Sequence, residues 1–133
     1  MSSKNLNIVW LKRDFRLQDH EALFNAVNEG GSILLVFCFE PSIYFDAHYS
    51  DFHFDFIRQS IEEMNVSLVA FDTKVMCVES EVIDLLEWAK DKFGDFKLWS
   101  SEETGLNITF QRDIRVAQWC EANKISWKEF QNN

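Results

Sequence analysis

The sequence predicts an α/β fold, a doubly wound, five-stranded parallel sheet with helices on both faces. Short, fully apolar runs alternate along the chain with amphipathic segments, and such runs are typical of strands covered on both faces of a parallel sheet. The chain has 133 residues, 47% of them apolar and 15% aromatic, with one Pro and four Gly. This composition predicts one compact domain and excludes disordered and collagen-like proteins.

The first half of the pattern begins with an apolar strand at Leu6 to Leu11. Asp19 stands where a helix N-cap belongs, and Gly30-Gly31 ends the helix that follows. Ile33 to Phe39 predicts a second buried strand, which Pro41 closes.

Two further helices and a third strand follow. Ser50 opens one helix, and Val66 to Phe71 reads as the third strand. Ser80 caps the next helix, and Gly94 ends it. The apolar positions of these helices share one face in each: Phe54, Ile57, Ile61 and Met64, then Val82, Leu85, Leu86, Ala89 and Phe93.

The last part of the chain adds the strand Phe96 to Trp99, a helix, and a closing strand at Ile125 to Phe130. The final helix carries an apolar stripe made of Phe110, Ile114, Ala117 and Cys120. In a sheet of this kind, ligands bind at the carboxyl ends of the strands, near the point where the strand order reverses.

Charge and hydropathy exclude some partners. The chain has 22 acidic and 13 basic residues and a net charge of -9, which opposes binding to the phosphates of DNA. No apolar run approaches the roughly 18 residues that span a bilayer, and the N-terminus does not resemble a signal peptide. We therefore expect a cytoplasmic protein without a membrane partner.

Metal, disulfide and nucleophile chemistry is not predicted either. Cys38, Cys77 and Cys120 lie in separate apolar patterns, so we expect three reduced, packed thiols. His48 and His53 lack a carboxylate or thiol at ligand spacing, and no Ser-His-Asp or Cys-His order is present. We assign no metal site and no catalytic residue.

The first strand-to-helix junction, Val9 to Leu23, lacks the glycines of a dinucleotide-binding loop. Instead, Lys12 to Arg16 contains three cations and one carboxylate. At the carboxyl edge of the sheet they form either a structural ion-pair network or a site for an acidic or anionic ligand.

The same junction resembles the opening of the photolyase/cryptochrome family: an apolar strand, Trp, a basic pair, Asp, an apolar residue, Arg-Leu, then Asp and Ala-Leu. The resemblance continues in Val36 to Pro41, where a strand ends in an acid-Pro turn, and in Arg58 to Ile61. It ends with Trp99 to Gly105 and the pair Arg112-Asp113.

The resemblance implies that residues 1–133 are the Rossmann-like, light-harvesting domain of a flavoprotein. Its partner is a FAD-binding helical domain of the same protein, outside this sequence, through which damaged DNA is bound. The parent is then a DNA photolyase, a carbon-carbon lyase that splits pyrimidine dimers, or a cryptochrome photoreceptor. The domain alone is not catalytic. The rivals from other classes are a free-standing nucleotide-binding α/β domain and a scaffolding domain.

An antenna pigment is the cofactor that the resemblance implies for this domain. The candidate residues come from the loops after the first, second and fourth strands: Arg13, Asp14, Pro41, Glu102 and Glu103. Where folate-using members have an Asn-Glu pair, this chain has Ile108 and Thr109. A deazaflavin-like pigment is therefore favoured over a folate, with Glu102 or Glu103 as its acid.

Aromatic residues are concentrated between residues 37 and 56. One helix gives only one stripe to a sheet, so we expect Tyr44 to Phe56 to lie at the surface, against another domain, a pigment or a weakly bound second copy. Five tryptophans are expected to pack in the core rather than carry electrons: Trp10, Trp88, Trp99, Trp119 and Trp127.

Overall fold

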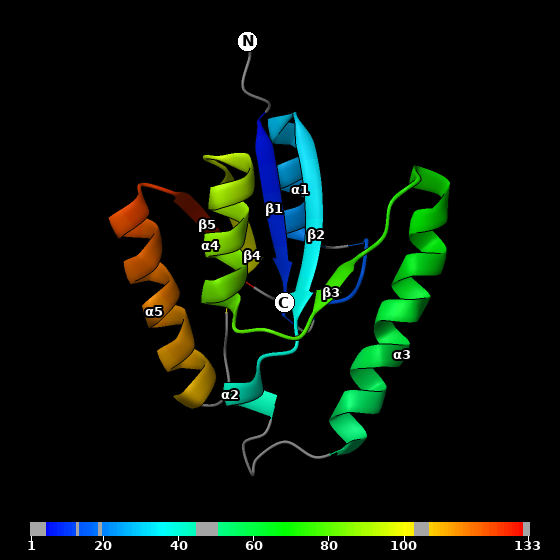
Figure 1. Cartoon of the computed structure of the whole chain (residues 1–133). Coiled ribbons are helices and arrows are strands. Elements are labelled where there is room, and N and C mark those ends of the chain that lie inside the picture. Colours follow the sequence, from blue (N-terminus) through cyan, green and yellow to red (C-terminus); the bar gives the residue numbers. More distant parts are fainter. Residues whose placement is uncertain (1–4, 13, 19, 45–50, 103–106, 132–133) are drawn as a thin grey trace.

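The computed structural model describes residues 5–12, 14–18, 20–44, 51–102 and 107–131, and in them five parallel strands form one sheet (Figure 1). The strands are β1 Leu6–Leu11, β2 Ser32–Cys38, β3 Met76–Val78, β4 Lys97–Ser101 and β5 Ser126–Phe130. The helices are α1 Glu21–Glu29, α2 Pro41–Tyr44, α3 Asp51–Leu68, the 3-10 turn η1 Val69–Phe71, α4 Val82–Phe93 and α5 Asn107–Asn123. The predicted fold class is confirmed.

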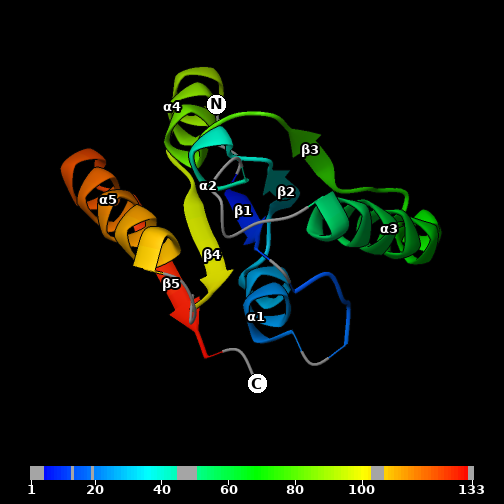
Figure 2. The ribbon, with the colours of Figure 1, turned by 90° about the horizontal axis from the view of Figure 1, so that it is seen from below.

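Helices cover both faces of the sheet. Figure 2 shows α1 and α3 on one side and α4 and α5 on the other. Strand β1 serves both layers because its side chains alternate: Val9 and Leu11 join the core under α1 and α3, whereas Ile8 and Trp10 join the core under α4 and α5. This explains why the strand is apolar at successive positions.

The strand order is β3-β2-β1-β4-β5, so the direction of winding reverses between β1 and β4. The chain leaves β1 toward α1 on one face and leaves β4 toward α5 on the other (Figure 2). In such sheets, ligands usually bind in a crevice at the carboxyl ends of the two strands where the order reverses.

The predicted third strand, Val66 to Phe71, is wrong. Helix α3 runs through Leu68, and η1 follows directly. The buried side chains of this segment fall at helical spacing: Ile57, Ile61, Met64 and Leu68. Val66 and Val69 are each 74% exposed, because they lie off that stripe. The true strand, β3, is three residues long and begins at Met76.

Two predicted helix caps are corrected. His20, not Asp19, is the N-cap of α1, and its Nδ1 accepts a hydrogen bond from the Leu23 backbone N–H at 3.1 Å. Glu81, not Ser80, is the N-cap of α4. Pro41 does end β2 and begins α2, where its fixed φ suits the first helical position.

Of the apolar stripe predicted for the last helix, only Cys120 faces the sheet. The buried side chains of α5 are Thr109, Arg112, Val116 and Cys120. Phe110 is 56% exposed and Ile114 38% exposed, and Ala117 is exposed as well. A buried ion pair of Arg112, described below, sets this orientation.

Two predictions of burial also need correction. Cys38 and Cys120 are packed free thiols, but Cys77 is exposed because β3 is an edge strand. Trp88 is 44% exposed, although its ring contacts Phe93 edge to face.

Candidate functional site

Asp14 joins the ends of two central strands. Its Oδ1 accepts a hydrogen bond from the Lys12 backbone N–H at 2.9 Å, and its Oδ2 accepts one from Ser101 Oγ at 2.8 Å. His20 Nε2 lies 2.7 Å from the same Oδ2. The carboxylate is buried and fixes the loop after β1 against the end of β4 and the start of α1.

The tautomer of His20 follows from its two contacts. Because Nδ1 accepts the Leu23 N–H, the ring proton belongs on Nε2, which lies 2.7 Å from Asp14 Oδ2. Burial by itself would raise the pKa of Asp14, but the hydrogen bonds from His20, Lys12 and Ser101 lower it far below its ordinary value. Asp14 is therefore an ionised and fully engaged carboxylate.

Glu40 is the second buried carboxylate at this edge. Its Oε1 accepts a hydrogen bond from Arg112 Nη1 at 2.7 Å, and its Oε2 accepts the backbone N–H of Val82 at 3.0 Å. Burial raises the pKa of Glu40, and the guanidinium opposes that rise. The pair connects the end of β2 with the N-terminus of α4 and with α5.

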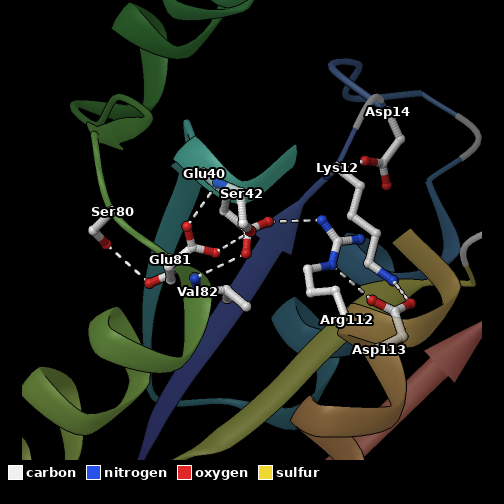
Figure 3. A network of polar contacts seen from close by, with 9 residues as sticks. All are labelled: Lys12, Asp14, Glu40, Ser42, Ser80, Glu81, Val82, Arg112 and Asp113. Atoms are coloured by element: carbon white, nitrogen blue, oxygen red, sulfur yellow. Dashed lines mark hydrogen bonds and ion pairs between the residues drawn. The ribbon is translucent and has the colours of Figure 1, made fainter. Parts of the chain in front are cut away.

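Helices α2 and α4 cap each other. Glu40, directly before α2, accepts the first N–H of α4, while Glu81, directly before α4, accepts both the Ser42 backbone N–H at 2.9 Å and Ser42 Oγ at 2.6 Å (Figure 3). Backbone N–H groups at a helix N-terminus have no partner within the helix, and here carboxylates from elsewhere in the chain accept hydrogen bonds from them in both helices. The arrangement fastens the segment after β2 to α4.

Arg112 and Lys12 complete the network over an indole ring. Arg112 Nε donates to Asp113 Oδ1 at 3.0 Å, and Lys12 Nζ donates to Asp113 Oδ2 at 2.7 Å (Figure 3). Lys12 Nζ lies 4.5 Å, and the Arg112 guanidinium carbon 4.8 Å, from the centre of the Trp10 ring. Both cations are thus held by carboxylates and an aromatic face.

A hollow of about 390 Å³ adjoins Asp14 at the same edge. Its walls come from the loop before α1, the start of α1, and the ends of β4 and β5: Arg16, Leu17, His20, Glu21, Phe24, Ser101 and Gln131. The volume lies in the range of small-molecule sites, roughly 300–1,000 Å³. Phe24, 65% exposed, offers an apolar surface there.

The predicted site residues come from separate elements. Asp14 is buried and engaged as described, Pro41 begins α2 and is exposed, and Glu102 is exposed just after β4, where its N–H donates to the Phe130 carbonyl at 2.7 Å. Arg13 and Glu103 lie outside the described residues. Within the run Lys12 to Arg16, the Lys12 ammonium pairs with Asp113 of α5. The Asp14 carboxylate contacts the Lys12 backbone N–H, Ser101 and His20.

The sequence interpretation missed His20 and Glu81 as polar members of this edge. The signal for His20 was its place directly before Glu21, with an imidazole able to accept the N–H three residues on. Glu81 was not recognised as the N-cap of the helix because Ser80, a more usual N-cap residue, directly precedes it.

The aromatic segment is only partly described. Phe56 is 58% exposed, in agreement with the predicted surface position. Phe45, Tyr49 and His48, and the side chains of Tyr44, Phe52, His53 and Phe54, lie outside the described part. In the described residues, no group of three His, Cys, Asp or Glu side chains is placed to hold a metal ion, and no helix is long and apolar enough to cross a bilayer.

Comparison with known proteins gives one family. The family model described as DNA photolyase matches residues 7–133. Cryptochrome DASH of Synechocystis sp. is 30% identical over 74 residues, which are 52% of this chain and 15% of that protein. Cryptochrome DASH of Xenopus laevis is 22% identical over 129 residues, 92% of this chain and 25% of that protein. The chain thus spans a quarter or less of these relatives.

Solved structures share the fold. One is an archaeal photolyase from Sulfolobus tokodaii, which was solved with two FAD molecules and is described as implying a novel light-harvesting cofactor. It superposes with a TM-score of 0.84 at 23% identity, and the match covers 96% of this chain and 29% of that one. A cryptochrome from Synechocystis sp. gives a TM-score of 0.85 at 19% identity, covering 98% of this chain and 28% of that one.

Proposed function

Because this chain belongs to the DNA photolyase family, we propose that it is the antenna-binding α/β domain of a longer, photolyase-like flavoprotein. The observation that carries the proposal is the family match over residues 7–133, which includes every strand of the sheet except the first residue of β1. The crevice between β1 and β4 gives such a domain a place for a pigment.

The pigment site that we propose lies at the carboxyl edge, where Arg13, Asp14, Pro41, Glu102 and Glu103 were predicted to contribute. Since three protein groups engage Asp14, its role there is to shape the wall of the hollow. Glu102 is exposed and free to approach a pigment. A deazaflavin-like pigment remains favoured over a folate, because Ile108 and Thr109 replace the residues that folate-using members supply.

In the parent protein, we propose, a helical domain holds FAD and meets damaged DNA. There the light-excited flavin passes an electron to a pyrimidine dimer and splits it. This chain supplies no catalytic residue to that step, and its charge of -9 disfavours direct contact with DNA phosphates. We place the parent protein in the cytoplasm.

A cryptochrome photoreceptor is the second candidate, since the curated relatives described above are named cryptochrome DASH. An antenna domain serves repair and signalling equally, so the choice between them depends on the helical domain. The free-standing nucleotide-binding alternative is not supported by the family match.

Pigment binding by the chain itself tests the proposal. A deazariboflavin and a reduced folate are titrated separately, and binding is followed by pigment fluorescence. We expect saturable binding of the deazariboflavin at one site per chain and weaker binding of the folate. Glu102→Lys should alter the deazariboflavin affinity, whereas Glu121→Gln, an exposed position in the last turn of α5, should not. If neither pigment binds saturably, the proposed function is wrong.

A further inference from the structure

An apolar groove of about 460 Å³ lies on the side of the sheet that α1 and α3 cover. Its floor is formed by Ile33 and Leu35 of β2, one wall comes from α1, and the other comes from the end of α3 and η1. Helix α1 packs on β1, β4 and β5, whereas α3 lies beyond β2 toward the β3 edge (Figure 2). The start of β2 is covered by neither helix, and Ile33 is only partly buried.

The walls of this groove expose large apolar side chains. Phe24 and Val27 of α1 are 65% and 58% exposed, and Phe71 of η1 is 70% exposed. The outward face of a surface helix normally carries charged or polar side chains. A cluster of exposed apolar side chains around a groove instead marks a surface that another molecule covers.

Both walls lack charge. Residues 22–28 and residues 65–71 contain no Asp, Glu, Lys or Arg, although these four types make up 26% of the chain. None of the side chains that line the groove is charged. Aromatic side chains together with a depletion of charge are typical of the buried centre of a protein interface. A strongly acidic or basic partner would find no counter-charge in the groove.

The groove also meets the requirement of a two-fold interface. In such an interface the same patch serves both copies, so the patch must offer a projection and a recess that receives it. Phe71 is the projection, and the groove floor at Ile33 and Leu35 is the recess. At the end of the groove, the exposed Asp72 and Lys74 flank Thr73, so two copies can pair these opposite charges reciprocally.

From this we infer that the groove between α1 and η1 is a docking surface for a second copy of this chain, with Phe71 of each copy seated in the groove of the other. The inference goes beyond the proposed function and does not depend on it. One groove makes a small interface, and the net charge of -9 on each copy opposes association, so we expect a weak, reversible dimer. Because apolar burial drives it, the dimer should tighten when salt screens the repulsion.

Sedimentation velocity of the unmodified chain over a range of concentrations tests the inference. We expect a shift from monomer to dimer as concentration rises, with the midpoint at lower concentration in high salt than in low salt. A chain that is still monomeric at about 1 mM would overturn the inference. Association that weakens as salt is added, or that continues beyond the dimer, would overturn it as well, because a two-fold apolar interface closes at two copies.

Variants locate the interface. Phe71→Glu places two like charges in the two-fold contact and should weaken the dimer at least about tenfold. Phe110→Glu makes the same change at a ring that is 56% exposed on α5, on the other side of the sheet, and should leave the dimer unchanged (Figure 2). Val27→Glu is a second test within the groove and should act like Phe71→Glu; Phe24 is left unaltered because it also lines the hollow at the carboxyl edge.

Urea denaturation of each variant shows whether it folds, so that a loss of association is compared only between folded chains. Equal weakening by Phe71→Glu and Phe110→Glu would overturn the inference, as would a dimer that folded Val27→Glu and Phe71→Glu chains form as tightly as the unmodified chain. None of these outcomes changes pigment binding at the hollow, so the proposed function is tested separately.

Discussion

Replacing Arg112 by Met tests whether the buried ion pair determines the stability of the carboxyl edge. Arg112→Met keeps an unbranched chain against Trp10 but removes the partner of Glu40 Oε1. In this variant Asp113 keeps its ion pair with Lys12. Among the carboxylates drawn in Figure 3, Glu40 alone is left without a cation. Glu40 keeps one hydrogen bond, from the Val82 N–H.

The magnitude follows from the burial of the two side chains, which are 6% and 2% exposed. Removing one member of a buried pair costs about 3–5 kcal/mol at neutral pH. Burial already raises the pKa of Glu40, and loss of Arg112 raises it further. A carboxyl group whose pKa is higher in the folded state binds its proton more tightly there, so the variant regains stability as pH falls toward about 4.3.

Urea denaturation at pH 5, 6 and 7, followed by tryptophan fluorescence, measures this effect. The stability difference between the unmodified chain and Arg112→Met should shrink as pH falls from 7 to 5, by at most about 1.4 kcal/mol per pH unit. The double variant Glu40→Gln/Arg112→Met should be more stable than Arg112→Met at pH 7, because it leaves no buried carboxylate at position 40 without its cation. A loss below about 1 kcal/mol at pH 7, or a loss equal at pH 5 and pH 7, would refute the reasoning.

Three further substitutions test other parts of the structure. Leu68→Ala should lower the free energy of unfolding, measured by urea denaturation, by about 2–4 kcal/mol, because Leu68 is buried on the α3 stripe. Val66→Ala should change it by less than about 0.5 kcal/mol, because Val66 is exposed. Equal losses in the two variants would favour the predicted strand over the helix. Asp14→Asn should cost about 2–3 kcal/mol at pH 7, where the lowered pKa of Asp14 contributes its full stability. In the unmodified chain that contribution is lost as pH falls below about 4, so the stability difference between the two proteins should become smaller in acid. A stability difference that does not change with pH would contradict an ionised Asp14.

The central strands β1 and β2 were predictable because they are apolar on both faces. Strands β1, β2, β4 and β5 lie within one or two residues of the predicted runs. The exception is β3, whose three residues are too few to show a pattern. Val66 to Phe71 looked more like a strand, because β-branched and aromatic side chains are enriched in strands.

The polar edge was predictable only in part. The local run from Lys12 to Arg16 indicated an ion-pair network, and the resemblance drew attention to Arg112-Asp113. What no local pattern indicates is the pairing of Glu40 with Arg112, which lie 72 residues apart in sequence. For the same reason the buried face of α5 was misassigned in part: apolar spacing favoured Phe110 and Ile114. The buried face instead carries Arg112 beside Val116 and Cys120.

The reciprocal caps of α2 and α4 also bear on how the chain folds. Each cap joins residues about forty positions apart: Glu40 and Val82 are separated by 42 residues, and Ser42 and Glu81 by 39. Caps that close such long loops contribute nothing to local helix nucleation and form only when the intervening strand and helix are in place. We therefore expect the two helix ends to gain their stability together, late in folding.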